Sequence, residues 1–154
     1  MRKRASYKGI YKPTNPKKYV GNINHIVYRS LWERKFMVYC DTQENIKHWS
    51  SEEFHVVYYN PVTKKLHKYF PDFVIKTNKN ENFMIEVKPA KYTVPPKKPK
   101  RKTKAYMAEQ LEYIKNKAKW SAAEEYCEQN NLKFKIFTEK ELAIPKPKLG
   151  RKHS

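Results

Sequence analysis

The fold is organised by two apolar runs, Tyr69-Phe70-Pro71-Asp72-Phe73-Val74-Ile75 and Phe83-Met84-Ile85-Glu86-Val87-Lys88. Side chains alternate between the two faces of a strand, so Glu86 and Lys88 share one face of the second run. Charged groups on an otherwise apolar strand are costly to bury unless something pairs them. Two carboxylates and a lysine, Asp72, Glu86 and Lys88, that converge at adjacent strands would suit a hard divalent cation and a phosphate.

The composition bounds the class of protein. The chain has 154 residues, the size of one domain, and 34 Lys and Arg against 15 Asp and Glu give a net charge of +19. This surplus predicts a polyanionic partner, with nucleic acid as the first candidate and an anionic membrane surface as the second. No apolar run approaches the roughly 20 residues of a membrane-spanning helix, and no secretory signal is apparent, so no membrane partner is expected. Cys40 and Cys127 lack metal-site spacing and are expected to be reduced core thiols.

The hydrophobic pattern predicts a helix, a three-stranded antiparallel meander, two helices and a final strand, which is an α/β class with a mixed sheet. Pro71 lies within the second strand of the meander and suits an edge or a bulge. The expected elements are a helix at 30–40, strands at 53–59, 66–75 and 82–88, helices at 103–115 and 119–129, and a strand at 132–137.

The Lys- and Pro-rich stretches predict a core at 28–142 with a basic N-terminal arm at 1–27 and a basic tail at 143–154. Within the core, a basic loop at 89–104 begins directly after Lys88. A solvated loop and a nuclear-localisation signal are alternatives, but its position favours contact with DNA phosphates. Its basic residues are Lys91, Lys97, Lys98, Lys100, Arg101, Lys102 and Lys104.

Glu33 allows two interpretations. Ser30 is a good N-cap and Glu33 completes a capping-box pattern, so Glu33 could act only as a helix cap, and the residues alone favour this. It also falls at the border of the apolar arc of that helix, from where it could face a site. In the nuclease interpretation, Asp72 and Glu86 bind Mg²⁺, and Lys88 orients the attacking water or offsets charge on the phosphate. Five scattered histidines and three glycines support neither a histidine-metal motif nor a glycine-rich phosphate loop.

The motifs resemble a known family. Pro71-Asp72, a hairpin and Glu86-Val87-Lys88 resemble the PD-(D/E)xK nuclease superfamily. The flanking motifs resemble the head-completion proteins of T-even-type tailed phages, and transposon end-cleaving nucleases are similar in the same elements. The flanking motifs are Tyr28-Arg29-Ser30-Leu31-Trp32-Glu33, Trp49-Ser50-Ser51-Glu52, Lys119-Trp120-Ser121-Ala122-Ala123 and Tyr126-Cys127. The resemblance covers residues 28–142.

The resemblance implies a restriction-endonuclease-like fold and Mg²⁺-dependent cleavage of double-stranded DNA, with Mn²⁺ as a substitute. It implies Asp72, Glu86 and Glu33 as metal ligands and Lys88 as the catalytic lysine, and it leaves open whether Glu52 or Lys119 joins the site. It also implies action on packaged DNA ends before tail attachment, with phage head, portal or neck proteins as partners, in the virion or the infected host cytoplasm. The alternatives are a structural head or neck protein that binds DNA without cutting, and a junction-resolving or transposon-end nuclease of the same superfamily.

Overall fold

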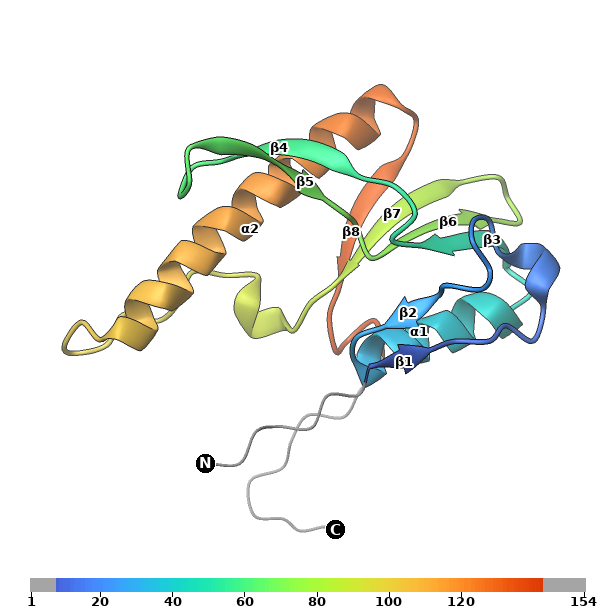
Figure 1. The fold of residues 1–154 in the computed structure, drawn as a ribbon, viewed down its shortest axis with the longest axis horizontal. Coiled ribbons are helices and arrows are strands. Elements are labelled where there is room, and N and C mark those ends of the chain that lie inside the picture. Colours follow the sequence, from blue (N-terminus) through green and yellow to red (C-terminus); the bar gives the residue numbers. More distant parts are fainter. Residues whose placement is uncertain (1–7, 143–154) are drawn as a thin grey trace, which may run out of the picture.

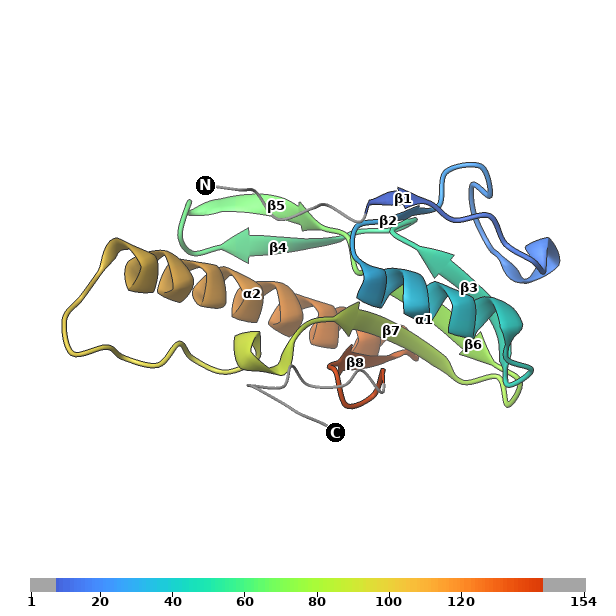
Figure 2. The same ribbon diagram turned by 90° about the horizontal axis from the view of Figure 1, so that it is seen from below.

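The computed structural model describes residues 8–142. The predicted tail at 143–154 and the first seven residues of the predicted N-terminal arm lie outside the described residues. Figure 1 shows a central sheet with one helix on each side, and Figure 2 shows the same two helices from below. This is the mixed α/β arrangement that the sequence predicts. None of the described helices is both long and apolar enough to cross a membrane.

The central sheet has four strands in the order β3-β6-β7-β8. The strands β3 (Ile46–Ser51), β6 (Phe73–Thr77) and β7 (Asn82–Val87) are antiparallel, and β8 (Lys133–Phe137) runs parallel to β7. Alternate residues of β6 and β7 face opposite sides. Phe73, Ile75 and Ile85 pack in the cluster with helix α1 (Leu31–Thr42), whereas Met84 packs in the cluster with helix α2 (Lys104–Gln129). The sheet is therefore buried on both faces.

The predicted three-stranded meander is wrong in its strand order. The run at 66–75 is two strands, β5 (Lys65–Tyr69) and β6, separated by an irregular segment that contains Pro71. Proline has no N–H to donate to a ladder, so the strand breaks there. β5 pairs with β4 (Val56–Asn60) in a separate hairpin that packs on α2, while β6 pairs with β3, which is not among the predicted strands.

Helix α1 begins as predicted and ends two residues later. The Ser30 hydroxyl accepts a hydrogen bond from the Glu33 amide at 3.1 Å. In a capping box the Glu33 carboxylate would accept a hydrogen bond from the amide of the N-cap, Ser30. Here it accepts instead from the amide of the preceding residue, Arg29, at 2.9 Å. The helix buries Phe36, Met37 and Cys40, whereas Leu31 and Tyr39 are exposed.

The two helices predicted at 103–115 and 119–129 are one continuous helix of 26 residues, α2. Thr103 caps it by accepting from the Tyr106 amide at 3.1 Å. The expected interruption at Asn116 does not occur, because Asn116 is buried against the rest of the protein and packing overrides its weak helix propensity. This continuity carries the second half of α2 beneath the β4–β5 hairpin, where Trp120 and Ala123 join the core.

The predicted N-terminal arm differs most from the structure. From Lys8 onward the segment is ordered and contributes Tyr11, Tyr19 and Ile26 to the hydrophobic core. Its regular elements are β1 (Gly9–Ile10), the short 3-10 helix η1 (Pro16–Lys18) and β2 (Val27–Tyr28). The described part of this segment is therefore part of the core and not a free arm.

Asp41 fastens this segment to α1. The carboxylate is fully buried and accepts hydrogen bonds from the Tyr11 hydroxyl at 2.6 Å and from the amides of Thr14 and Asn15 at 2.7 and 2.9 Å. The Asn15 side chain donates back to the Asp41 carbonyl at 2.8 Å. Tertiary hydrogen bonds of this kind are invisible in a sequence pattern.

Replacing Asp41 by alanine is expected to lower the free energy of unfolding by about 3 kcal/mol or more, because each stranded donor costs about 1–3 kcal/mol. Urea unfolding of wild type and Asp41→Ala measures the difference. Glu44→Ala, an exposed acid just beyond the same helix, should change stability by less than about 0.5 kcal/mol. Equal losses in the two variants would contradict the anchoring role of Asp41.

Candidate active site

Asp72 lies at the break between β5 and β6, next to the buried Pro71. Its Oδ2 accepts a hydrogen bond from the Val87 amide at 2.8 Å. Since Phe73 is paired with Ile85 in the β6–β7 ladder, the same register places Asp72 beside Glu86. The proline break and the ladder together hold the two carboxylates at one end of the sheet.

Glu86 is buried and faces the α2 side of the sheet. The Tyr69 hydroxyl, at the end of β5, donates to its Oε1 at 2.6 Å. Its Oε2 lies 3.9 Å from Nζ of Lys88, two residues along the same face. The structure thus brings together Asp72, Glu86 and Lys88, three of the four residues predicted to form the site.

Burial disfavours the charged form of these acids. It raises the pKa of Asp72 well above that of a free aspartate, and the charges of Glu86 and Glu33 raise it further. Burial also raises the pKa of Glu86. The hydrogen bond from Tyr69 and the charges of Lys88 and Lys119 lower this pKa, but burial has the larger effect. The pKa of Glu33 is raised chiefly by burial. Close negative charges in a shielded setting are stabilised when a cation neutralises them.

Glu33 lies near Asp72 and Glu86. Its carboxylate is occupied by the Arg29 amide, although it is close enough to Asp72 for their charges to interact. Among residues 8–142, no three His, Cys, Asp or Glu side chains are arranged as a ready ligand set for a metal ion. The role of Glu33 as a third ligand therefore stays a prediction.

The Asp72 and Glu86 pair nevertheless fits Mg²⁺. This ion keeps several waters and usually takes only one or two protein carboxylates besides substrate phosphates. Oδ1 of Asp72 makes no hydrogen bond within the described part of the chain, which leaves it available as an oxygen ligand. The hard oxygen donors and their excess negative charge match the chemistry of that ion.

Arg29 and Glu52 form a further feature beside the acids. The Arg29 guanidinium donates two hydrogen bonds to the Glu52 carboxylate, at 3.0 and 3.1 Å. The Glu52 backbone has a positive φ of 52°, and its amide donates to the carbonyl of Asp72 at 3.2 Å. The Glu52 carboxylate is thus engaged by Arg29 near the site. The sequence motifs contained both residues, but they gave no sign that these two pair.

Two other residues gain significance from the structure. Tyr69 begins the first of the two apolar runs, and its hydroxyl orients Glu86. Lys119, on α2, places its Nζ 5.6 Å from the centre of the Tyr69 ring. A signal was present for each, in the apolar run and in the Lys119-Trp120 motif, but the sequence did not show which face of α2 meets β5.

The basic loop follows the predicted site. Up to Lys104, where α2 begins, it contains the short 3-10 helix η2 (Ala90–Tyr92) and no other helix or strand, and it runs back along the N-terminal half of α2 (Figures 1 and 2). All seven of its predicted DNA-binding residues are exposed. Their contact with DNA stays a prediction.

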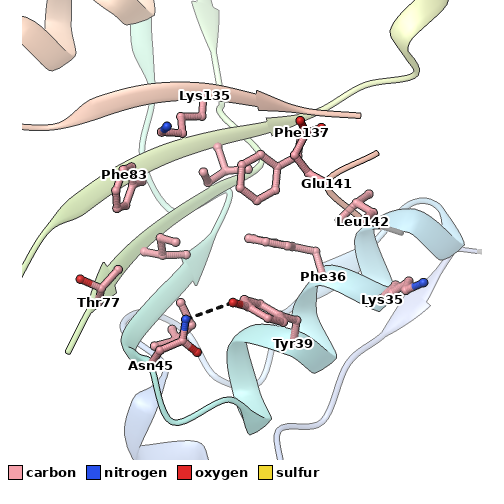
Figure 3. Close-up of a pocket in the computed structure, with 13 residues that line it drawn as sticks. Lys35, Phe36, Tyr39, Asn45, Thr77, Phe83, Lys135, Phe137, Glu141 and Leu142 are labelled. Carbon is pink, nitrogen blue, oxygen red and sulfur yellow. Dashed lines mark hydrogen bonds between the residues drawn. The ribbon is translucent and has the colours of Figure 1, made fainter. Parts of the chain in front are cut away.

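A separate pocket lies away from these residues. It has a volume of about 490 Å³ and lies between α1 and the opposite face of the sheet, where Phe36, Phe83 and Phe137 line it (Figure 3). The Asn45 amide donates to the Tyr39 hydroxyl at its border, at 3.1 Å. None of the four predicted site residues lines this pocket, so the acid pair and not this cavity carries the candidate chemistry.

The chain is similar to known nucleases. Residues 43–139 match the family described as TnsA-like endonuclease N terminal. The head completion nuclease of Enterobacteria phage T4 is 37% identical over 138 residues, which cover 87% of this chain and 92% of that protein. The family match includes Asp72, Glu86 and Lys88 and begins after Glu33.

Proposed function

This chain belongs to the TnsA-like endonuclease family, and we propose that it is a Mg²⁺-dependent DNA endonuclease that prepares packaged DNA ends during phage head completion. The relative from phage T4 carries the name head completion nuclease, which supports a nuclease of that type. The reaction is hydrolysis of a phosphodiester bond in double-stranded DNA. We place its action in the virion or the infected host cytoplasm, with head, portal or neck proteins as partners.

One observation carries the catalytic part of the proposal. Asp72 and Glu86 lie side by side at the end of the sheet, and Nζ of Lys88 is 3.9 Å from the Glu86 carboxylate. Asp72 and Glu86 would hold Mg²⁺, with Glu33 as a further candidate ligand. When bound, the ion supplies a Lewis acid for the phosphate and lowers the pKa of a coordinated water.

The surrounding side chains have separate tasks in this proposal. Lys88 orients the attacking water or offsets negative charge that develops on the phosphate. The Tyr69 hydroxyl fixes the orientation of the Glu86 carboxylate through its 2.6 Å hydrogen bond. The Val87 amide does the same for Asp72 at 2.8 Å. These two contacts hold the acids in place before any ligand arrives.

We expect wild-type protein with Mg²⁺ or Mn²⁺ to cleave duplex DNA, and excess chelator to stop the cleavage. Lys88→Ala should cleave at least about 100-fold more slowly, because removal of one group that stabilises the transition state typically lowers the rate by this factor. Gel assays of linear and circular duplex DNA measure the rates. Lys79→Ala, at the exposed turn that ends β6 at the far end of the sheet, should cleave at the wild-type rate. Absence of cleavage by wild type with either ion, or equal rates for wild type and Lys88→Ala, would refute the proposal.

The same assay separates the nuclease types. A head-completion role predicts efficient cleavage near the ends of plain linear duplex DNA. A junction-resolving enzyme would prefer branched DNA, and a transposon-end enzyme would require a specific terminal sequence. A marked preference for either of the last two substrates would contradict the head-completion assignment while leaving the endonuclease assignment intact.

A further inference from the structure

Lys119 lies near the acid pair on a different element from Lys88, and its charge lowers the pKa of Glu86. It lies on α2 and places Nζ 5.6 Å from the centre of the Tyr69 ring, whose hydroxyl donates to Glu86 at 2.6 Å. A cation over an aromatic face is attracted by the ring quadrupole, so the ring holds the ammonium group near the acids. Glu86 is therefore flanked by two lysines, one from its own strand and one from the helix.

Lys119 has no carboxylate within ion-pair distance among the described residues. Its neighbour one turn earlier, Lys115, is paired with Glu112 at 3.0 Å. Lys119 is half-buried, and this burial lowers its pKa, as does the charge of Lys115. A half-buried ammonium group without a close counter-ion is costly to keep. An anion from outside the chain that contacts the Lys119 ammonium group would stabilise its charged form.

The charge balance of the site indicates which anion. A polyanion that approaches Asp72, Glu86 and Glu33 is repelled by their carboxylates unless cations lie alongside. Lys88 supplies one such cation, and Lys119 supplies another on the α2 side. The basic loop follows the N-terminal half of the same helix (Figure 1), so a nucleic-acid backbone that crosses both would meet Lys119 between them.

We propose that Lys119 binds a backbone phosphate of the DNA at the active site, next to the phosphate that is cleaved. This inference rests on the proposed function and adds a contact residue on α2. The Tyr69 ring holds the Lys119 ammonium group, and the same residue orients Glu86. DNA bound by Lys119 would therefore lie beside Tyr69, the residue that orients the Glu86 carboxylate.

The test compares Lys119→Met with Lys119→Arg. Methionine keeps an apolar stem against Tyr69 and removes the charge, so thermal unfolding should show an intact fold. Lys117→Met is the matched control, since two residues of helix turn it about 200° away from Lys119 and it is exposed. Each change is measured for DNA binding in an Asp72→Asn background, which prevents cleavage, and for cleavage in the wild-type background.

We expect Lys119→Met to reduce the slope of log affinity against log salt by about 0.9, the value for one phosphate contact in duplex DNA. Cleavage at subsaturating DNA should fall by roughly 10-fold or more, as expected when one charge-assisted hydrogen bond is lost. Lys119→Arg should restore both quantities, and Lys117→Met should leave the cleavage rate unchanged.

The binding measurement keeps this inference separate from the proposed function. If wild type cleaves DNA and Lys119→Met has the wild-type salt slope, the phosphate contact is refuted and the endonuclease assignment stands. If wild type does not cleave with Mg²⁺ or Mn²⁺, the proposed function fails, but a reduced slope restored by arginine still supports the Lys119 contact. A slope that arginine does not restore overturns it in either case.

Discussion

Asp72→Asn is expected to abolish detectable DNA cleavage and, at the same time, to raise the temperature of thermal unfolding. Asparagine can still accept the Val87 amide hydrogen bond but carries no charge for a metal ion. The raised pKa of Asp72, caused by burial and by the charges of Glu86 and Glu33, means that its ionised form disfavours folding at neutral pH. Removal of about 1 kcal/mol of this penalty would raise the midpoint by roughly 2–4 °C.

Calorimetry at neutral pH without divalent ions measures the first half of this prediction. Glu81→Gln removes an exposed acid from the β6–β7 turn and should leave both the midpoint and cleavage unchanged. Addition of Mg²⁺ should raise the midpoint of wild type, because a ligand that binds only the folded state stabilises it, and should leave that of Asp72→Asn unchanged. A lower midpoint for Asp72→Asn than for wild type would show that the charge is already satisfied within the protein.

The acid pair could be predicted from the sequence because its geometry is local. Alternation along one strand fixes the shared face of Glu86 and Lys88, and one short turn brings β6 back beside β7. Pro71 indicated an irregularity next to Asp72, and the structure has a complete break there. Local rules also gave the Ser30 cap of α1.

The remaining differences between the predicted and the observed fold come from interactions between segments that are distant in the sequence. The ordered position of residues 8–27 depends on the buried carboxylate of Asp41 and on tyrosines that pack in a core formed later in the chain. The hairpin β4–β5 leaves the main sheet because β6 pairs with β3 instead. Asn116 stays helical because it is buried. Periodicity contains no information about such partners, so it could not supply them.

The same limit applied to the second lysine. Lys119 belongs to the motif Lys119-Trp120-Ser121-Ala122-Ala123, but its place near the acids depends on α2 being continuous and packed beneath β4. An interrupted helix, as the sequence predicted, would have left its direction undefined. The acids and Lys88 were therefore predictable from two strands, whereas the place of Lys119 required the whole fold.

Replacement of four loop lysines, Lys97, Lys98, Lys100 and Lys102, by glutamine is expected to weaken DNA binding by at least about tenfold at moderate salt. If all four contact phosphates, the slope of log affinity against log salt should fall by up to about 3.6, at about 0.9 for each contact. All four side chains are exposed, so the fold should be unaffected. The maximal cleavage rate at saturating DNA should change little, because the loop changes leave Asp72, Glu86 and Lys88 in place.

The control for this loop variant must match its change in net charge. Lys12, Lys47, Lys79 and Lys133 are also exposed but lie outside the loop, and their replacement by glutamine lowers the charge of the chain by the same four units. With a chain charge of +19, a general attraction to DNA would weaken binding equally in both variants. A larger loss of affinity and of salt slope in the loop variant would instead localise the DNA backbone to the segment that leads from Lys88 to α2.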